Sequence, residues 1–104
     1  MYKLKFMFDW CSGVCLWSTN KASEDKFGGY PVSTAVLPVS QALKEELDRL
    51  IVLHDKALNW ADPSGDLLWS ESQARVFLTA AKNACSALRN ELGTEYEITF
   101  FDQI

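Results

Sequence analysis

The residues best suited to chemistry are three cysteines, Cys11, Cys15 and Cys85, and a single histidine, His54. Cys11 and Cys15 are separated by three residues, whereas zinc knuckles and redox dithiols normally use two. A four-ligand zinc site would have to recruit His54 and Cys85 from two different predicted helices. We therefore expect no metal, no cofactor and no disulfide framework, with Cys85 packed in the core as a small apolar side chain.

Any Cys/His or Ser/His mechanism in this chain must use His54, which lies on the apolar stripe of a predicted helix. Its neighbour Asp55 gives a titrating imidazole a carboxylate partner, but no nucleophile or oxyanion site is identifiable. We favour a core or interface histidine and predict that the chain is not an enzyme. A small thiol- or metal-dependent enzyme built on Cys11, Cys15, His54 and Asp55 is the alternative from a different class.

The N-terminal residues predict a β-hairpin. Between residues 2 and 10 every second side chain is apolar or aromatic, which is the period of a strand with one buried face. A turn around Gly13 follows, and the apolar segment 14–18 is expected to fold back as the second strand. A short helix is expected up to residue 27, where Gly28 and Gly29 stop it, followed by a connector over 30–38.

A closing strand is predicted over 95–101, where polar and apolar residues alternate again. Its exposed face carries Glu95 and Glu97, and the exposed face of the first strand carries Lys3 and Lys5. Opposite charges on neighbouring strands are favourable. We therefore expect the two terminal strands to lie side by side.

Helical periodicity predicts two long helices, over about 41–59 and 71–92, each preceded by a serine N-cap. Ser70 and Gln73 fit a capping box, and Gly93 is placed to end the second helix in the left-handed conformation. The predicted buried stripe of the second helix is Ala74, Phe77, Leu78, Ala81, Cys85, Leu88 and Leu92.

These elements predict an α+β fold: a small, mostly antiparallel sheet, made of the N-terminal hairpin and the C-terminal strand, with two long helices on one face in a two-layer sandwich. The 104 residues show no break in composition, so we expect a single domain over 1–104. No apolar run approaches the roughly 20 residues needed to cross a bilayer, and the N-terminus does not resemble a signal peptide. We expect a cytoplasmic protein with no membrane partner.

The net charge of −4 lies entirely in the last residues, in Glu91, Glu95, Glu97 and Asp102, because the rest of the chain is balanced. Phosphate backbones are bound by clustered Lys and Arg, and no such cluster is present. We therefore expect no direct binding of nucleic acid, and a basic protein as the better partner.

Two of the four tryptophans, Trp60 and Trp69, bracket the loop between the long helices. One interpretation is structural: each tryptophan closes an end of the fold and its indole nitrogen finds a partner. The other is an interface, because Asp62, Asp66 and Glu71 surround the pair and no basic residue lies between them. If the acids of the tail are paired with lysines, this loop is the predicted partner-binding surface.

Several short segments of the chain are distinctive: Phe8-Asp9-Trp10-Cys11, Cys15-Leu16-Trp17-Ser18, Phe27-Gly28-Gly29-Tyr30-Pro31, Leu37-Pro38-Val39-Ser40, His54-Asp55 and Leu58-Asn59-Trp60. Together they resemble immunity proteins of bacterial contact-dependent growth inhibition and related polymorphic toxin systems. The similarity is greater up to about Trp60 than in the second long helix. It implies a cytosolic inhibitor that binds the C-terminal domain of a cognate toxin, often a nuclease, by direct contact. A structural subunit of a larger assembly is a further alternative.

Overall fold

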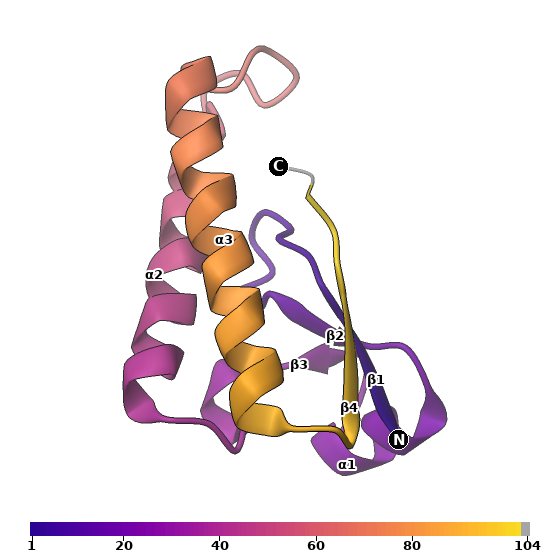
Figure 1. The fold of residues 1–104 in the computed structure, drawn as a ribbon. Helices are drawn as coiled ribbons and strands as arrows, with labels where there is room; N and C mark the ends of the chain where they lie inside the picture. Colours follow the sequence, from indigo (N-terminus) through magenta and orange to yellow (C-terminus); the bar gives the residue numbers. More distant parts are fainter. Residues whose placement is uncertain (103–104) are drawn as a thin grey trace.

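The computed structural model describes residues 1–102, in which a four-stranded sheet lies beside two long helices (Figure 1). The sheet order is β3-β2-β1-β4; β1 pairs antiparallel with β2 and parallel with β4, and β2 pairs antiparallel with β3. The predicted α+β fold is confirmed. In chain order the elements are β1 (Tyr2–Phe6), β2 (Leu16–Ser18), α1 (Lys21–Phe27), β3 (Pro31–Val32), the 3-10 turn η1 (Thr34–Val36), α2 (Gln41–Ala57), α3 (Glu71–Leu92) and β4 (Tyr96–Phe100).

The hairpin of β1 and β2 forms as predicted, but β1 is shorter than the alternation suggested. It ends at Phe6 instead of residue 10, although the Met7 amide still donates to the Cys15 carbonyl at 2.9 Å. Beyond this point the chain turns, with Cys11 at a φ of 66°. The turn takes Trp10 out of the strand and stacks its ring on a helix side chain, so the last aromatic of the alternating pattern serves a different contact.

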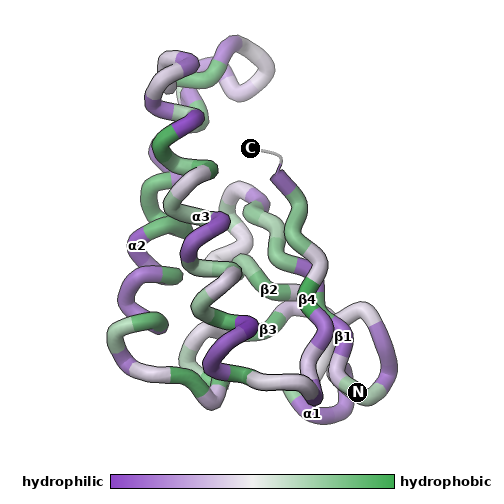
Figure 2. The backbone as a smooth tube through the Cα atoms, in the orientation of Figure 1, coloured by the Kyte–Doolittle hydropathy of each residue, from purple (hydrophilic) through white to green (hydrophobic). Residues whose placement is uncertain are grey.

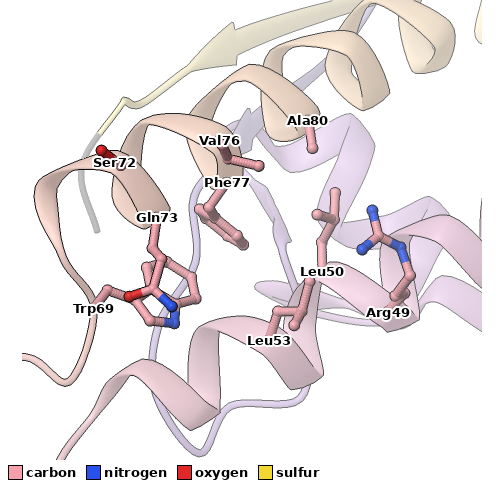
Figure 3. A pocket seen from close by; sticks show the side chains of 9 residues that line it. All are labelled: Arg49, Leu50, Leu53, Trp69, Ser72, Gln73, Val76, Phe77 and Ala80. Atoms are coloured by element: carbon pink, nitrogen blue, oxygen red, sulfur yellow. The ribbon is translucent and has the colours of Figure 1, made fainter.

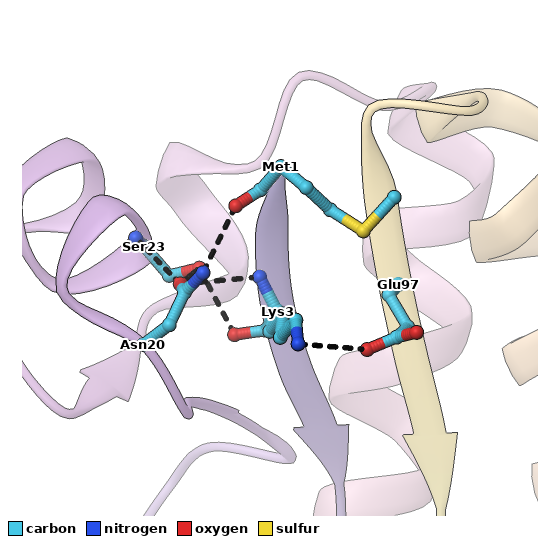
Figure 4. A network of polar contacts seen from close by, with 5 residues as sticks. All are labelled: Met1, Lys3, Asn20, Ser23 and Glu97. Carbon is cyan, nitrogen blue, oxygen red and sulfur yellow. Dashed lines mark hydrogen bonds and ion pairs between the residues drawn. The ribbon is translucent and has the colours of Figure 1, made fainter.

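The terminal strands lie side by side, as the charge pattern predicted, and they run parallel. Lys3 is in register with Glu97, and their side chains form an ion pair of 3.8 Å (Figure 4). Lys5 is in register with Thr99, so of the two lysines expected to face Glu95 and Glu97 only Lys3 forms an ion pair with them among residues 1–102. The ammonium of Lys5 instead lies 5.2 Å from the ring centroid of Tyr30, where it can make a cation–π contact.

The short helix α1 is fastened to β1 by its N-cap, Asn20. The Asn20 carboxamide oxygen accepts from the Ser23 amide at 3.1 Å and from the Lys3 amide at 3.2 Å (Figure 4). Its amide nitrogen donates to the Met1 carbonyl at 2.9 Å. Gly28, at φ 83° and ψ 20°, ends the helix in the left-handed conformation as expected.

Both long helices begin where the sequence predicted. Ser40 caps α2, and Ser70 caps α3 in a complete capping box with Gln73. The end of α3 differs in one detail, because Gly93 has a φ of 84° but a ψ of −167°, outside the left-handed helical region. Glycine tolerates this positive φ, and a turn over residues 94 and 95, in which the Tyr96 amide donates to the Gly93 carbonyl at 3.3 Å, leads into β4.

The core lies between the sheet and the long helices. Figure 2 shows hydrophobic and hydrophilic residues alternating in bands along α2 and α3, as expected for helices with one buried face. The segment 30–38, predicted as a connector, contributes the edge strand β3, and its Pro31 occupies a position where a missing amide hydrogen is tolerated. The most deeply buried apolar side chains are Leu4, Phe6, Cys15, Leu16, Val32, Leu47, Leu50, Ala57, Ala81, Cys85 and Leu88.

Candidate functional site

The loop between α2 and α3 lies at the end of the helical hairpin that extends beyond the sheet (Figure 1). It is held by the C-terminus of α2, whose last carbonyl groups have no partner within the helix. Groups from outside the helix supply the missing donors. They are Trp10 Nε1 to the His54 carbonyl at 2.8 Å, Trp60 Nε1 to the Asp55 carbonyl at 2.9 Å, and the Leu68 amide to the Ala57 carbonyl at 2.8 Å.

The carboxylates of the loop are open to solvent. Asp62, Asp66 and Glu71 are all exposed. Glu71 forms an ion pair with Arg75 at 3.7 Å, one helical turn further on. Among residues 1–102, no ion pair within 4 Å involves Asp62 or Asp66, and the only side-chain bond to either carboxylate is from the Ser64 hydroxyl to Asp62, at 3.2 Å. These two carboxylates therefore keep their negative charge available for a partner.

The two tryptophans of the loop have different roles. Trp60 is 52% exposed, so much of its ring faces solvent. The nitrogen edge of the ring is held by its hydrogen bond to the C-terminal end of α2. Trp69 is half-buried, and its ring packs on Phe77 with centroids 4.9 Å apart. The structural and the interface interpretations of these residues are therefore compatible, because each ring is anchored on one side only.

An apolar groove between α2 and α3 begins at Trp69 (Figure 3). It has a volume of about 350 Å³, and Leu50, Leu53 and Phe77 line its middle part. This groove was not predicted from the sequence, because Val76 falls outside the predicted buried stripe. The available signal was the β-branched apolar residue itself, which is 71% exposed on a face of α3 where a polar residue is expected.

His54 is buried at 1% exposure in a box of aromatic rings. Its imidazole stacks on Trp10, with ring centroids 4.5 Å apart and an interplanar angle of 19°. The ring centroids of Phe8 and Phe77 lie 5.4 and 5.8 Å from that of His54. Burial lowers the pKa of His54, against a smaller opposing effect of the Asp55 and Asp9 carboxylates. Its Nε2 atom has no hydrogen-bond partner among the described residues. A buried neutral imidazole fits the predicted packing role.

The three cysteines do not form a reactive group. Cys15 and Cys85 are buried, whereas Cys11 is exposed on the hairpin turn. Burial raises the pKa of Cys15 to about 12 and raises that of Cys85, so both remain protonated thiols at neutral pH. Across residues 1–102, no three His, Cys, Asp or Glu side chains are grouped so that they could hold a metal ion. The described helices also include none long and apolar enough to span a membrane.

Exposed aromatic side chains lie beside an open apolar groove, and aromatic residues are enriched where proteins bind one another. The comparison with known families agrees with a protein-binding role. The chain belongs to the family described as Serratia CdiI immunity protein-like, whose model matches residues 2–103. The predicted resemblance to immunity proteins is confirmed, and it includes α3 and β4 as well as the N-terminal segments. No curated protein sequence matches the chain at a significant level.

Proposed function

We propose that this protein is a non-enzymatic immunity protein that neutralises the C-terminal domain of a cognate toxin by binding it directly. The observation that carries the proposal is the family match over residues 2–103. The buried His54 and the protonated thiols of Cys15 and Cys85 support a role without catalysis, because these groups are not available to a substrate. In this proposal the inhibitor acts in the cytoplasm, where it meets the incoming toxin.

The proposed contact surface is the acidic loop with its tryptophans: Trp60, Asp62, Asp66, Trp69 and Glu71. The aromatic rings supply area that a partner can bury, and the unpaired carboxylates steer a basic partner into place. The proposed partner is a basic toxin domain, and a nuclease fits this description since it must grip phosphates.

The proposal is tested by co-expression. The C-terminal domain encoded by the large-protein gene immediately upstream is produced in cells with or without this chain, and growth is measured. We expect growth arrest without the chain and normal growth with it, together with a purified complex of defined stoichiometry. Growth arrest in both cultures, with no complex between the purified proteins, would overturn the proposal.

Charge reversal tests the contact surface separately from the function. Asp62→Lys combined with Asp66→Lys should reduce the association rate by at least about tenfold at low salt, because steering depends on the field at the loop. The control is Glu45→Lys with Glu95→Lys, the same charge change on exposed residues at the opposite end of the helical hairpin. Equal association rates for the two double variants would place the contact elsewhere.

A further inference from the structure

The groove between α2 and α3 is a second feature of the surface next to the loop. Trp69 and Gln73 lie at one end and Arg49 at the other, with Leu53 and Val76 between them (Figure 3). A cavity of about 350 Å³ with mostly apolar walls is within the range that receives ligand-sized groups. The groove is therefore a place where apolar side chains of another molecule can lose their contact with water.

The groove continues along the outer face of α3. A second hollow of about 510 Å³ shares Ser72, Val76 and Ala80 with the first and extends to Asn83. From Ser72 to Asn83 the helix rises about 16 Å at 1.5 Å per residue, which is three helical turns. Arg75 also lines this hollow and is held by Glu71 at 3.7 Å, whereas Ser72, Thr79 and Ala80 are small enough to let a second helix approach. An apolar groove that continues into a more polar hollow over this length matches a short amphipathic helix, which presents both kinds of side chain.

The charges around the groove indicate the sign of the charge that a partner should carry. At the loop end the carboxylates of Asp62 and Asp66 have no ion-pair partner among residues 1–102. At the far end Arg49 is already neutralised by Glu46, through hydrogen bonds of 2.6 and 2.9 Å from its guanidinium. At the loop end these two carboxylates outnumber the exposed ammonium of Lys56, which also has no ion-pair partner among residues 1–102, so the excess charge there is negative, whereas Arg49 at the other end is neutralised. A second copy of this chain carries the same net charge of −4, so a basic partner fits better than a self-associating one.

We infer that the groove receives an amphipathic helix of the toxin domain. Apolar side chains of that helix, at helical spacing, pack on Leu53, Trp69 and Val76, and its basic residues lie beside Asp62 and Asp66. Trp69 lines the groove and also borders the acidic loop, so the two features form one continuous surface. This inference rests on the proposed function, since it names which part of the toxin domain the inhibitor holds and where.

The test uses two exposed valines of the same helical hairpin. Val76→Glu places a charge inside the groove, and Val52→Glu places the same charge on α2 outside it; their wild-type side chains are 71% and 51% exposed, so both variants should fold. The Kd for the purified toxin C-terminal domain is measured by calorimetry, and folding is checked by circular dichroism. We expect Val76→Glu to raise the Kd by at least about 30-fold, the effect of a binding hot spot, and Val52→Glu to change it by less than about threefold.

The outcomes separate the inference from the proposed function. If the wild-type chain binds the toxin domain and Val76→Glu binds equally well, the groove is not the contact and the inference is overturned, while the proposed function stands. If the wild-type chain does not bind the toxin domain at all, the proposed function fails first. Sedimentation of the free chain tests the competing occupant: a wild-type dimer that Val76→Glu converts to monomer would assign the groove to a second copy and overturn the inference.

Discussion

Acidification should destabilise this protein through His54. The imidazole is buried at 1% exposure against Trp10, and its Nε2 atom has no hydrogen-bond partner among residues 1–102. Burial lowers its pKa from the ordinary 6.5, and the Asp55 and Asp9 carboxylates oppose this only in part. The folded state therefore holds a neutral imidazole, whereas the unfolded chain takes up a proton near pH 6.5.

The direction in which stability changes with pH follows from this difference in proton binding. The contribution of His54 to stability is fully present above pH 6.5 and is lost as the pH falls below that value, until the folded-state pKa is reached. Between pH 7.5 and 5.5, the free energy of unfolding should fall, by at most about 1.4 kcal/mol for one proton per molecule.

Urea denaturation followed by tryptophan fluorescence at pH 7.5 and 5.5 measures this loss. Other groups titrate in the same range, so the comparison is with His54→Phe, which keeps an aromatic ring against Trp10 and removes the titrating nitrogen. Between the two pH values the variant should lose less stability than the wild type, by up to about 1.4 kcal/mol. The same pH dependence in both proteins would refute the assignment to His54.

Further predictions concern the thiols, a helix cap and the core. In the native protein at pH 8, Ellman's reagent should modify Cys11 rapidly, while Cys15 and Cys85 react only after denaturation; three fast-reacting thiols would contradict their burial. Ser70→Ala removes the N-cap of α3 and should lower the free energy of unfolding by about 1 kcal/mol, whereas Ser70→Asp should retain most of it. Phe77→Ala should cost about 3–5 kcal/mol in urea denaturation, because the ring is 4% exposed; a loss below about 1 kcal/mol would contradict its place in the core.

Local chemistry accounts for the parts of the fold that were predictable. The serine caps, the capping box of Ser70 with Gln73 and the stop at Gly28 are each settled by a few neighbouring residues, so they appear in the sequence as recognisable patterns. The alternation in the terminal strands depends on burial of one face only. The pair of Lys3 with Glu97 was predictable from charge, but its register was not, because strand register depends on the whole sheet.

Some features of the candidate site also follow from local sequence, and others only from the tertiary structure. The sequence by itself determined the acidic, aromatic composition of the loop, since Trp60, Asp62 and Asp66 are close in the chain and no basic residue separates them. Only the tertiary structure decided that the indole of Trp10 donates to the His54 carbonyl at the end of α2, and that Trp69 opens an apolar groove together with Val76. Grooves and long-range hydrogen bonds depend on how helices far apart in the sequence pack together, and periodicity within one helix contains no record of its neighbour.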